Sequence, residues 1–472
     1  MKTIVPIVMP NHFNYSQFHW IPANCVFLAT SINGAGMSPR IVDDRVQSRD
    51  LTKKRLSELL PESLAVLISA ASGSQLLNAI QIASWVKEKF PGMPVVFGGP
   101  FPSAEPKLTL SSSLVDFVIA GQGEFSSAEL CKGLLNGDLN PDRIPNLYFR
   151  KKSGEIAISS APRVNFDIND LPDLSYFDRE VIQLENYINP ETRAINYSTS
   201  TGCVGSCTFC YWHPDYRPSF FKVDRVLRDL KRFREELNIW NINFDDPTFF
   251  VKPSRVLEIV NGIRNNLPGV HWRANGRIDT MSAFPSDYYD QIKSSGCDLV
   301  HIGLESGSPR ILKLMQKNIC LEDTLKLIRE TKRTGIRSRF HVLLGIPTET
   351  LEDLKQTADF IRRLQLEDEE LDYTVNFFTP YPGNYLTGLA MENGYKAPCS
   401  LEECASLMFT NYKHIPEDDR MILKETSPWK EDFLIPWFSP EFTKEYFRAF
   451  RELFPEKNEI MTTGGKMENI FS

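Results

Sequence analysis

The chain has 472 residues, a formal net charge of -7, 42% hydrophobic residues and 24% charged residues. This is the composition of an ordinary soluble globular protein, and the length predicts two or three domains. A negative net charge argues against a nucleic-acid partner, which requires a basic surface. The sequence has no uncharged apolar run of about 18 residues and no signal peptide. We therefore expect no membrane span and a cytoplasmic protein.

Residues 1–143 alternate between strand-like and helix-like segments. Short apolar runs rich in valine and isoleucine predict buried parallel strands, and Leu76–Phe90 has the broad apolar face of a helix. The predicted strands are Ile4–Met9, Leu64–Ser69, Pro94–Phe97 and Val115–Ala120. Alternation of this kind predicts an α/β fold with a doubly wound, Rossmann-like sheet whose ligands bind outside the carboxyl ends of the strands.

The rest of the chain is divided into three parts. Residues 144–187 form a predicted linker with a short strand pair, Asn146–Arg150 and Glu155–Ser159. Residues 188–396 contain six βα-like units and predict a partial (βα)6 barrel of the TIM type. Its predicted strands are Ile195–Ser200, Ile239–Phe244, Val270–Ala274, Leu299–Leu304, Phe340–Leu344 and Tyr373–Phe378. Residues 397–472 predict a small helical region that covers the barrel mouth.

Three of the nine cysteines are grouped. Six are scattered among apolar neighbours and are interpreted as small buried residues. The others, Cys203, Cys207 and Cys210, follow the first barrel strand with the spacing C-x3-C-x2-C. Three thiolates suit a soft metal site and leave one iron of a [4Fe–4S] cluster without a protein ligand. The alternative is a zinc site, which needs a fourth ligand such as His213.

This cysteine loop, with Phe209 as the aromatic residue before the third cysteine, resembles the cluster motif of the radical S-adenosylmethionine (SAM) superfamily. Further segments of the superfamily pattern follow the later barrel strands in order. They are Asn243–Thr248, Arg273–Arg277, Gly303–Ser308, Gly345–Thr350 and Thr379–Gly383. The resemblance implies a [4Fe–4S] cluster that cleaves SAM to a 5′-deoxyadenosyl radical. It also implies an electron donor of the flavodoxin or ferredoxin type.

The same resemblance implies contacts to SAM. Asp245 or Asp246 is expected to accept from the ammonium group, and Arg277 or Ser306 to donate to the carboxylate. We expect Glu305 to bind the ribose hydroxyls, and the turn at Gly345 to let the backbone approach the adenine. Phe209 is expected beside the cluster and SAM. Each polar residue has a structural alternative, such as a helix cap for Ser306 or an ordinary ion pair for Arg277.

The first domain resembles the cobalamin-binding domain that precedes the barrel in one radical SAM branch. The resemblance rests on Val95–Pro100, Asp116–Glu124 and the Leu171–Leu174 segment of the linker. Glycines at strand ends let a bulky macrocycle approach the backbone. The expected cobalamin-binding residues are His12, Ser69, Ser72, Gly98, Gly99, Gly121, Gly123 and Glu124. The pattern D-x-H-x-x-G is absent, so we expect base-off cobalamin without a protein histidine on cobalt.

The branch resemblance implies a C-methyltransferase that moves a methyl group from methylcobalamin to an unactivated carbon. Two alternatives remain open. The first is an enzyme that uses the same cofactors for cyclisation, ring contraction or oxidation without methyl transfer. The second is a sensor or binding protein that keeps the cluster without radical chemistry. The residues do not identify the substrate.

Overall fold

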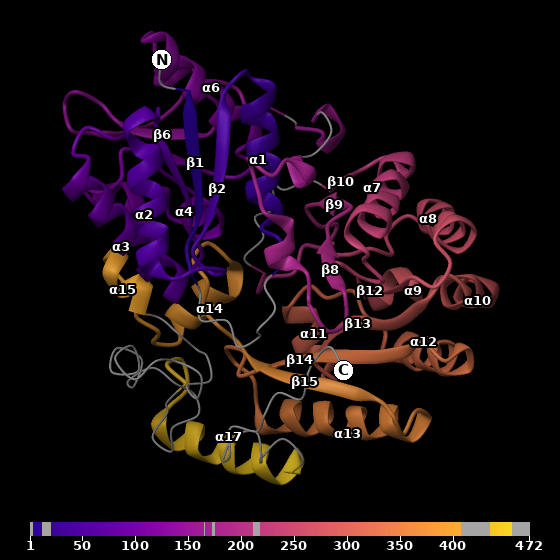
Figure 1. The fold of residues 1–472 in the computed structure, drawn as a ribbon. Coiled ribbons are helices and arrows are strands. Elements are labelled where there is room, and N and C mark those ends of the chain that lie inside the picture. Colours follow the sequence, from indigo (N-terminus) through magenta and orange to yellow (C-terminus); the bar gives the residue numbers. More distant parts are fainter. Residues whose placement is uncertain are drawn as a thin grey trace.

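The computed structural model describes residues 3–11, 20–164, 166–171, 175–210, 218–406 and 435–455. Two sheets organise the molecule (Figure 1), and the chain passes from the first sheet to the second between Ser159 and Arg193. The predicted α/β class, with a Rossmann-like domain followed by a partial barrel, is confirmed.

The first sheet has the strand order β2-β1-β3-β4-β5-β6-β7. Its first five strands are parallel, and the last two are antiparallel to their neighbours. The strands are β1 (Ile4–Met9), β2 (Ser38–Asp43), β3 (Val66–Ser69), β4 (Val95–Gly98), β5 (Phe117–Ile119), β6 (Leu147–Arg150) and β7 (Ile156–Ile158). The order 2-1-3-4-5 is that of a doubly wound sheet with a ligand crevice where the winding reverses.

Helices cover both faces of this sheet. They are α1 (Ala23–Gly34), α2 (Arg49–Leu59), α3 (Ser74–Lys89), α4 (Pro100–Ala104), α5 (Pro106–Ser111) and α6 (Glu124–Asn136). The buried residues of α1 and α6 share a core with the inner residues of β1, whereas those of α2 and α3 pack in a second core. Alternate residues of β1 point to opposite faces, so Val5 and Ile7 join the first core and Val8 the second.

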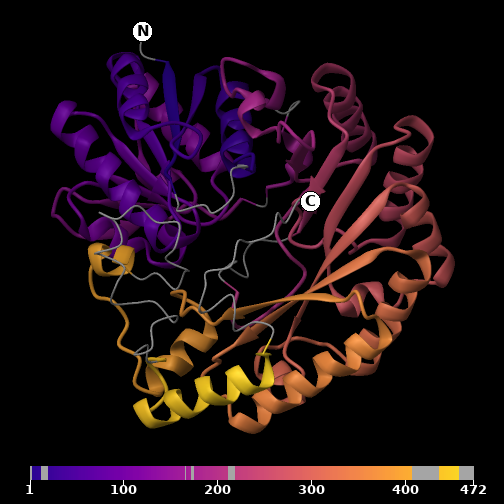
Figure 2. The same cartoon turned by 60° about the horizontal axis from the view of Figure 1, so that its bottom comes forward.

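The second sheet is a six-stranded parallel sheet in the order β15-β14-β13-β12-β11-β8. Figure 2 shows it curving beside the first domain, as an open barrel does. Its strands are β8 (Ala194–Tyr197), β11 (Asn241–Phe244), β12 (His271–Gly276), β13 (Cys297–Glu305), β14 (Arg337–Leu344) and β15 (Asp372–Phe377). A small antiparallel pair, β9 (Ser200–Thr201) and β10 (Ser219–Phe220), flanks the first barrel strand.

The outer layer of the barrel is helical. It contains α7 (Val223–Leu237), α8 (Pro253–Asn266), α9 (Ile278–Met281), α10 (Ser286–Ser294), α11 (Pro309–Leu314), α12 (Leu321–Thr334) and α13 (Leu351–Glu367). Beyond the barrel come α14 (Tyr385–Glu392), α15 (Leu401–Ser406) and α17 (Pro440–Leu453). Helix α17 runs beside α13, while α15 packs on α3 of the first domain (Figures 1 and 2). No helix in these described parts of the chain is long and apolar enough to cross a membrane.

Two elements differ from the sequence-based expectation. Strand β2 was not predicted, because Ser-Pro-Arg-Ile-Val-Asp carries a proline and a charge that suit only an edge strand. The strand pair expected inside the linker instead extends the first sheet, since β6 pairs with β5. A short polar hairpin shows no sequence sign of which sheet it will join.

The two domains are tied together at the start of the barrel. The Ile21 backbone N–H donates to Oδ1 of Asn196 on β8 over 2.6 Å, and this hydrogen bond is buried. The preceding residue, Trp20, is held by the first domain. Its carbonyl accepts a hydrogen bond of 2.8 Å from Arg45, which is ion-paired with Asp43 at the end of β2. The carboxyl ends of both parallel sheets therefore border the same space between the domains.

Candidate cofactor site

The loop that carries the three cysteines is fixed at its centre by Thr208. The Thr208 backbone N–H donates to the Met315 carbonyl over 3.0 Å, and its hydroxyl donates to the Leu314 carbonyl over 2.9 Å. On the other side, the Leu386 N–H donates to the Thr208 carbonyl over 3.2 Å. The loop thus lies between the end of α11 and the start of α14, with Cys203, Cys207 and Cys210 all partly exposed.

The arrangement of the thiols suits a cluster. Within the described residues, no three cysteine, histidine or carboxylate side chains converge on the position of one metal ion. A [4Fe–4S] cluster needs no such convergence, because each thiolate binds a different iron. The Gly205 N–H donates to the Cys203 sulfur over 3.3 Å and Arg277 Nη1 donates to the Cys207 sulfur over 3.6 Å. The zinc alternative depends on His213, which lies outside the described residues.

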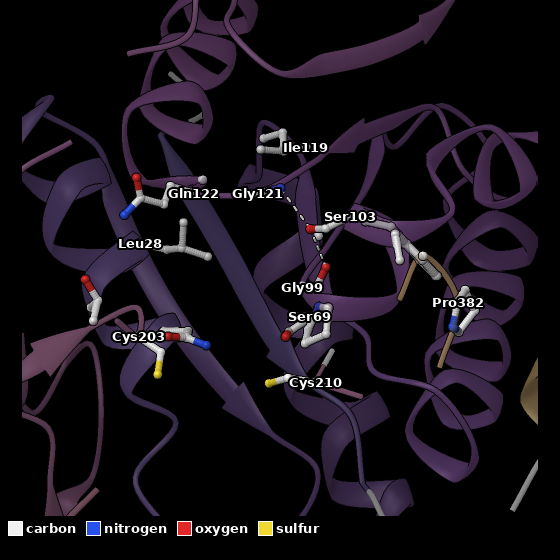
Figure 3. Close-up of a pocket in the computed structure, with 18 of the residues that line it drawn as sticks. Leu28, Ser69, Gly99, Ser103, Ile119, Gly121, Gln122, Cys203, Cys210 and Pro382 are labelled. Carbon is white, nitrogen blue, oxygen red and sulfur yellow. Dashed lines mark hydrogen bonds between the residues drawn. The ribbon is translucent and has the colours of Figure 1, made fainter. Parts of the chain in front are cut away.

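A cavity of about 440 Å³ joins this loop to the first domain. All three cysteines line it from one side, and strand ends of the Rossmann-like sheet line it from the other. Figure 3 shows the Cys203 and Cys210 sulfurs on the edge of this space, with Ser69, Gly99 and Leu28 facing it. The sequence-predicted residues in its wall are Ser69, Gly98, Gly99, Gly121, Gly123 and Glu124. Ser72 lines a neighbouring cavity, and His12 lies outside the described residues.

Two of the glycines have distinct backbone roles. Gly99 has φ +95°, and a Cβ there would lie 2.9 Å from the Ala70 carbonyl oxygen. Gly121 has φ +84° and open space around it. Ser103 joins the two turns, since its hydroxyl donates to the Gly99 carbonyl over 2.6 Å and accepts from the Gly121 N–H over 2.8 Å (Figure 3). These turns leave backbone, rather than side chains, at the cavity wall, which suits a large planar ligand.

A second cavity, of about 660 Å³, adjoins the first. Asp245 from the end of β11 and Asn275 from β12 line it, together with Tyr381 after β15. Burial, followed by the charge of Asp246, raises the pKa of Asp245 to about 7. The Asp245 carboxyl has a hydrogen bond with the Asn196 side chain, and it becomes a good acceptor when a ligand brings an ammonium group.

Asp246 lies elsewhere. Its side chain is fully buried and lines neither cavity. It accepts from the Thr199 N–H and hydroxyl and from the Ser200 hydroxyl, so it fixes the start of the cysteine loop. Of the two candidates for the SAM ammonium group, Asp245 therefore has the suitable position.

The remaining SAM candidates are held by protein partners. Glu305 has φ +68° and an ion pair of 2.8 Å with Lys317, whose Nζ lies 5.9 Å from the centre of the Phe209 ring. The fully buried hydroxyl of Ser306 lies 3.0 Å from that of Thr357 and accepts from the Ser308 N–H. These contacts stabilise the turn after β13. Phe209, Glu305, Ser306 and Arg277 line neither cavity.

The family matches of the chain show which cofactors the cysteine loop and the glycine turns belong to. Residues 197–361 match the radical SAM superfamily, and residues 14–130 match the B12 binding domain. The chain belongs to the cobalamin-dependent radical SAM enzymes. Membership implies a [4Fe–4S] cluster, SAM and cobalamin as cofactors and an external electron donor. The three half-exposed thiols and the glycine-lined turns fit these groups.

The chain is similar to three further proteins. An uncharacterized methyltransferase of Pyrococcus horikoshii is 26% identical over 359 residues, which are 75% of each chain. The radical SAM methyltransferase TsrM of Kitasatospora setae, solved with cobalamin and a [4Fe–4S] cluster, has a TM-score of 0.67 at 18% identity, covering 84% of this chain and 76% of TsrM. The cobalamin-dependent enzyme OxsB, solved with aqua-cobalamin and SAM, also scores 0.67 at 18% identity, covering 97% of this chain and 61% of OxsB. The structural likenesses confirm the fold.

Glu124 is a buried carboxyl among the residues that line the first cavity of this radical SAM enzyme. It begins α6 and is 8% exposed, and its Oε2 atom has no hydrogen-bond partner within the described residues. Burial raises the pKa of Glu124 to about 7. The carboxyl group is therefore protonated at mildly acidic pH, and its Oε2 atom is buried without a partner in the part of the chain that the structure describes.

This burial predicts a pH dependence of stability. An unfolded glutamate has a pKa of about 4.3, so the folded state holds the extra proton between that value and 7. Glu124 therefore lowers the stability by roughly 1.4 kcal/mol per pH unit as pH rises through this window. In cobalamin-free protein, we expect the melting temperature of Glu124→Gln to rise progressively above that of the wild type between pH 5 and pH 7, and the difference to level off at higher pH. A melting difference that does not change with pH contradicts the assignment.

Sequence reasoning missed a set of contacts around Gly345. The Gly345 N–H donates to Glu349 Oε2 over 2.6 Å and to the Tyr446 hydroxyl over 3.1 Å, and Trp437 Nε1 donates to the Gly345 carbonyl over 2.9 Å. The Tyr446 hydroxyl also donates to Glu349 over 2.6 Å. Two C-terminal residues thus fix the turn after β14. Because Tyr446 lies about 100 residues later, no local sequence signal indicates the contact.

We expect Tyr446→Phe to lower the free energy of unfolding by about 1–3 kcal/mol, because it leaves the buried Glu349 carboxyl short of a donor. Thermal melting of the protein measures this loss. Tyr395→Phe is the matched control, since the Tyr395 hydroxyl is buried without a hydrogen-bond partner in the described residues. Equal melting temperatures for the wild type and Tyr446→Phe would show that the contact contributes nothing.

Proposed function

We propose that this radical SAM enzyme methylates an unactivated carbon atom of its substrate. One observation carries the proposal: the cluster-loop cysteines and the glycine turns of the B12-binding domain line the same cavity. When bound, the reduced cluster with SAM supplies a 5′-deoxyadenosyl radical, and methylcobalamin supplies a methyl group. A shared cavity suits a reaction in which hydrogen abstraction and methyl addition occur on one substrate carbon.

The chain's own residues have separate tasks in this proposal. Cys203, Cys207 and Cys210 would hold three irons of the cluster and leave the fourth for SAM. Asp245 accepts from the SAM ammonium group, and the second cavity beside it holds SAM and the substrate. The turns at Ser69, Gly98–Gly99 and Gly121–Gly123, with Glu124, bind cobalamin. Base-off cobalamin without a protein histidine on cobalt stays part of the proposal.

The proposed domains follow the sheets. Residues 1–159 form the cobalamin-binding domain, because β6 and β7 belong to its sheet. The linker then runs to about residue 187, the radical SAM barrel spans 188–396, and the C-terminal region follows. All nine cysteines are free of disulfides, as suits a reducing compartment. We therefore also propose a cytoplasmic location and a donor of the flavodoxin or ferredoxin type.

A single-turnover experiment tests methyl transfer. Anaerobically reconstituted protein, loaded with cobalamin and reduced to cob(I)alamin, is mixed with SAM labelled in its methyl group. We expect the label to move to protein-bound cobalamin with one equivalent of S-adenosylhomocysteine, faster than to free cob(I)alamin in the same buffer. A transfer rate equal to that of free cob(I)alamin contradicts the proposal and favours cyclisation or oxidation. Absence of 5′-deoxyadenosine as well, after reduction of the cluster, favours a sensor.

A further inference from the structure

Arg277 lies against the cysteine loop with its charge largely out of solvent. The residue is 8% exposed, and Nη1 donates to the Cys207 sulfur over 3.6 Å. Its other two nitrogens are held by Asp279, with Nε 2.9 Å and Nη2 2.6 Å from the carboxylate oxygens. This bidentate ion pair fixes the plane of the Arg277 guanidinium, so that the remaining nitrogen, Nη1, points at the Cys207 sulfur.

The cysteine loop is shaped to admit this guanidinium. A Cβ on Gly205 would lie 2.5 Å from Arg277 Nη1, and within 3.5 Å of the Cys207 sulfur. Gly205 does not have the positive φ that would itself require glycine. The absence of a side chain at position 205 is therefore explained by the close approach of Arg277 to the loop.

A second buried cation lies behind the first. Lys317 is 8% exposed, and its Nζ lies 2.8 Å from Glu305 Oε1. The same Nζ lies 5.9 Å from the centre of the Phe209 ring, which belongs to the cysteine loop. Two buried positive charges therefore lie beside the cysteine loop, and each is fixed by its own carboxylate.

Reduction of a cluster adds one negative charge close to these cations. The attraction between opposite charges is stronger in a partly buried site than in water, and donors to the sulfurs set the potential of a cluster. We infer that Arg277, supported by Lys317, stabilises the reduced cluster at Cys207 and so raises its reduction potential, instead of binding the SAM carboxylate. The inference rests on the proposed function, which places a cluster at these cysteines.

The electron balance is simple. The cluster gains one electron from a flavodoxin- or ferredoxin-type donor, which is oxidised by one electron, and no bond or proton changes at Arg277. A higher cluster potential makes this transfer more favourable. Arg277 therefore acts on the electron-transfer step and not on the affinity for SAM.

The test measures the midpoint potential of the reconstituted cluster by redox titration followed by electron paramagnetic resonance, without SAM. We expect Arg277→Gln to have a lower potential than the wild type, and Arg277→Lys to lie between them. Gly205→Ala keeps the charge but displaces Nη1, so it should also lower the potential. Arg310→Gln is the control, because the Arg310 guanidinium contacts Asp353 over 2.5 Å and the Thr348 carbonyl over 2.7 Å instead of the cysteine loop.

The outcomes separate the two proposals. A cluster-loaded Arg277→Gln protein with the wild-type potential overturns the inference, as does a tenfold loss of SAM affinity without a shift in potential. If Arg277→Gln does not load a cluster, the potential of Gly205→Ala decides in the same way. Failure of the wild type itself to hold a cluster would instead contradict the proposed function.

Discussion

We expect the Cys207→Ala protein to hold no stable [4Fe–4S] cluster and to form no detectable 5′-deoxyadenosine from SAM. Two remaining thiolates leave two irons without protein ligands, and a cluster so exposed loses iron to solvent. Iron and sulfide analysis after anaerobic reconstitution measures the loss directly. Analysis of the SAM products under reducing conditions measures its consequence.

Cys320→Ala provides the control for this experiment. Cys320 lies outside the loop and, like Cys399, is exposed and not buried as the sequence predicted, so its variant should load iron and cleave SAM as the wild type does. The same loss is expected for Cys203→Ala and Cys210→Ala. A Cys207→Ala protein with wild-type iron content would show that the cluster is held elsewhere.

The second large effect is expected at Gly99. An alanine there would place its Cβ 2.9 Å from the oxygen and 3.0 Å from the nitrogen of Ala70, at a φ of +95°. With ψ at -173°, this backbone conformation is essentially confined to glycine and costs about 1–3 kcal/mol for an L-residue, and the contact forces the ends of β3 and β4 apart. We expect cobalamin affinity to fall at least roughly tenfold, about 1.4 kcal/mol. Equilibrium binding of cobalamin to the protein measures the change.

Gly36→Ala separates strain from crowding. Gly36 also has a positive φ, +84°, but a Cβ there meets no atom within 4 Å, and Gly36 lines neither cavity. We expect this variant to lose about as much stability from the backbone strain, with little loss of cobalamin affinity. Equal losses of affinity in both variants would mean that the Gly99 turn is not specific to the cobalamin site.

The barrel and the cysteine loop were predictable because their signals are local. The strands of the barrel are apolar runs. The three cysteines Cys203, Cys207 and Cys210 stand within a segment of eight residues that follows the first barrel strand. The predicted strands of both sheets are found with ends shifted by a few residues. The glycine turns of the first domain were also predictable, since Gly98–Gly99 follows a valine-rich strand directly.

What the sequence did not indicate depends on contacts between distant residues. Asp245 and Asp246 are alternatives in sequence, and only the hydrogen bonds of Asp246 to Thr199 and Ser200 show which carboxyl remains for a ligand. The same holds for Arg277, whose partner Cys207 is 70 residues away. Side-chain direction at a strand end is set by tertiary packing, which a motif does not record.

The central claim is that the cluster and cobalamin occupy one cavity, and the magnetic interaction between them tests it most directly. Electron paramagnetic resonance is recorded on reconstituted protein that contains both cob(II)alamin and the reduced cluster. We expect the cob(II)alamin signal to broaden and relax faster than in Cys207→Ala protein, which has cobalamin alone. A spectrum that is the plain sum of the two separate signals, with unchanged relaxation, would contradict the shared cavity.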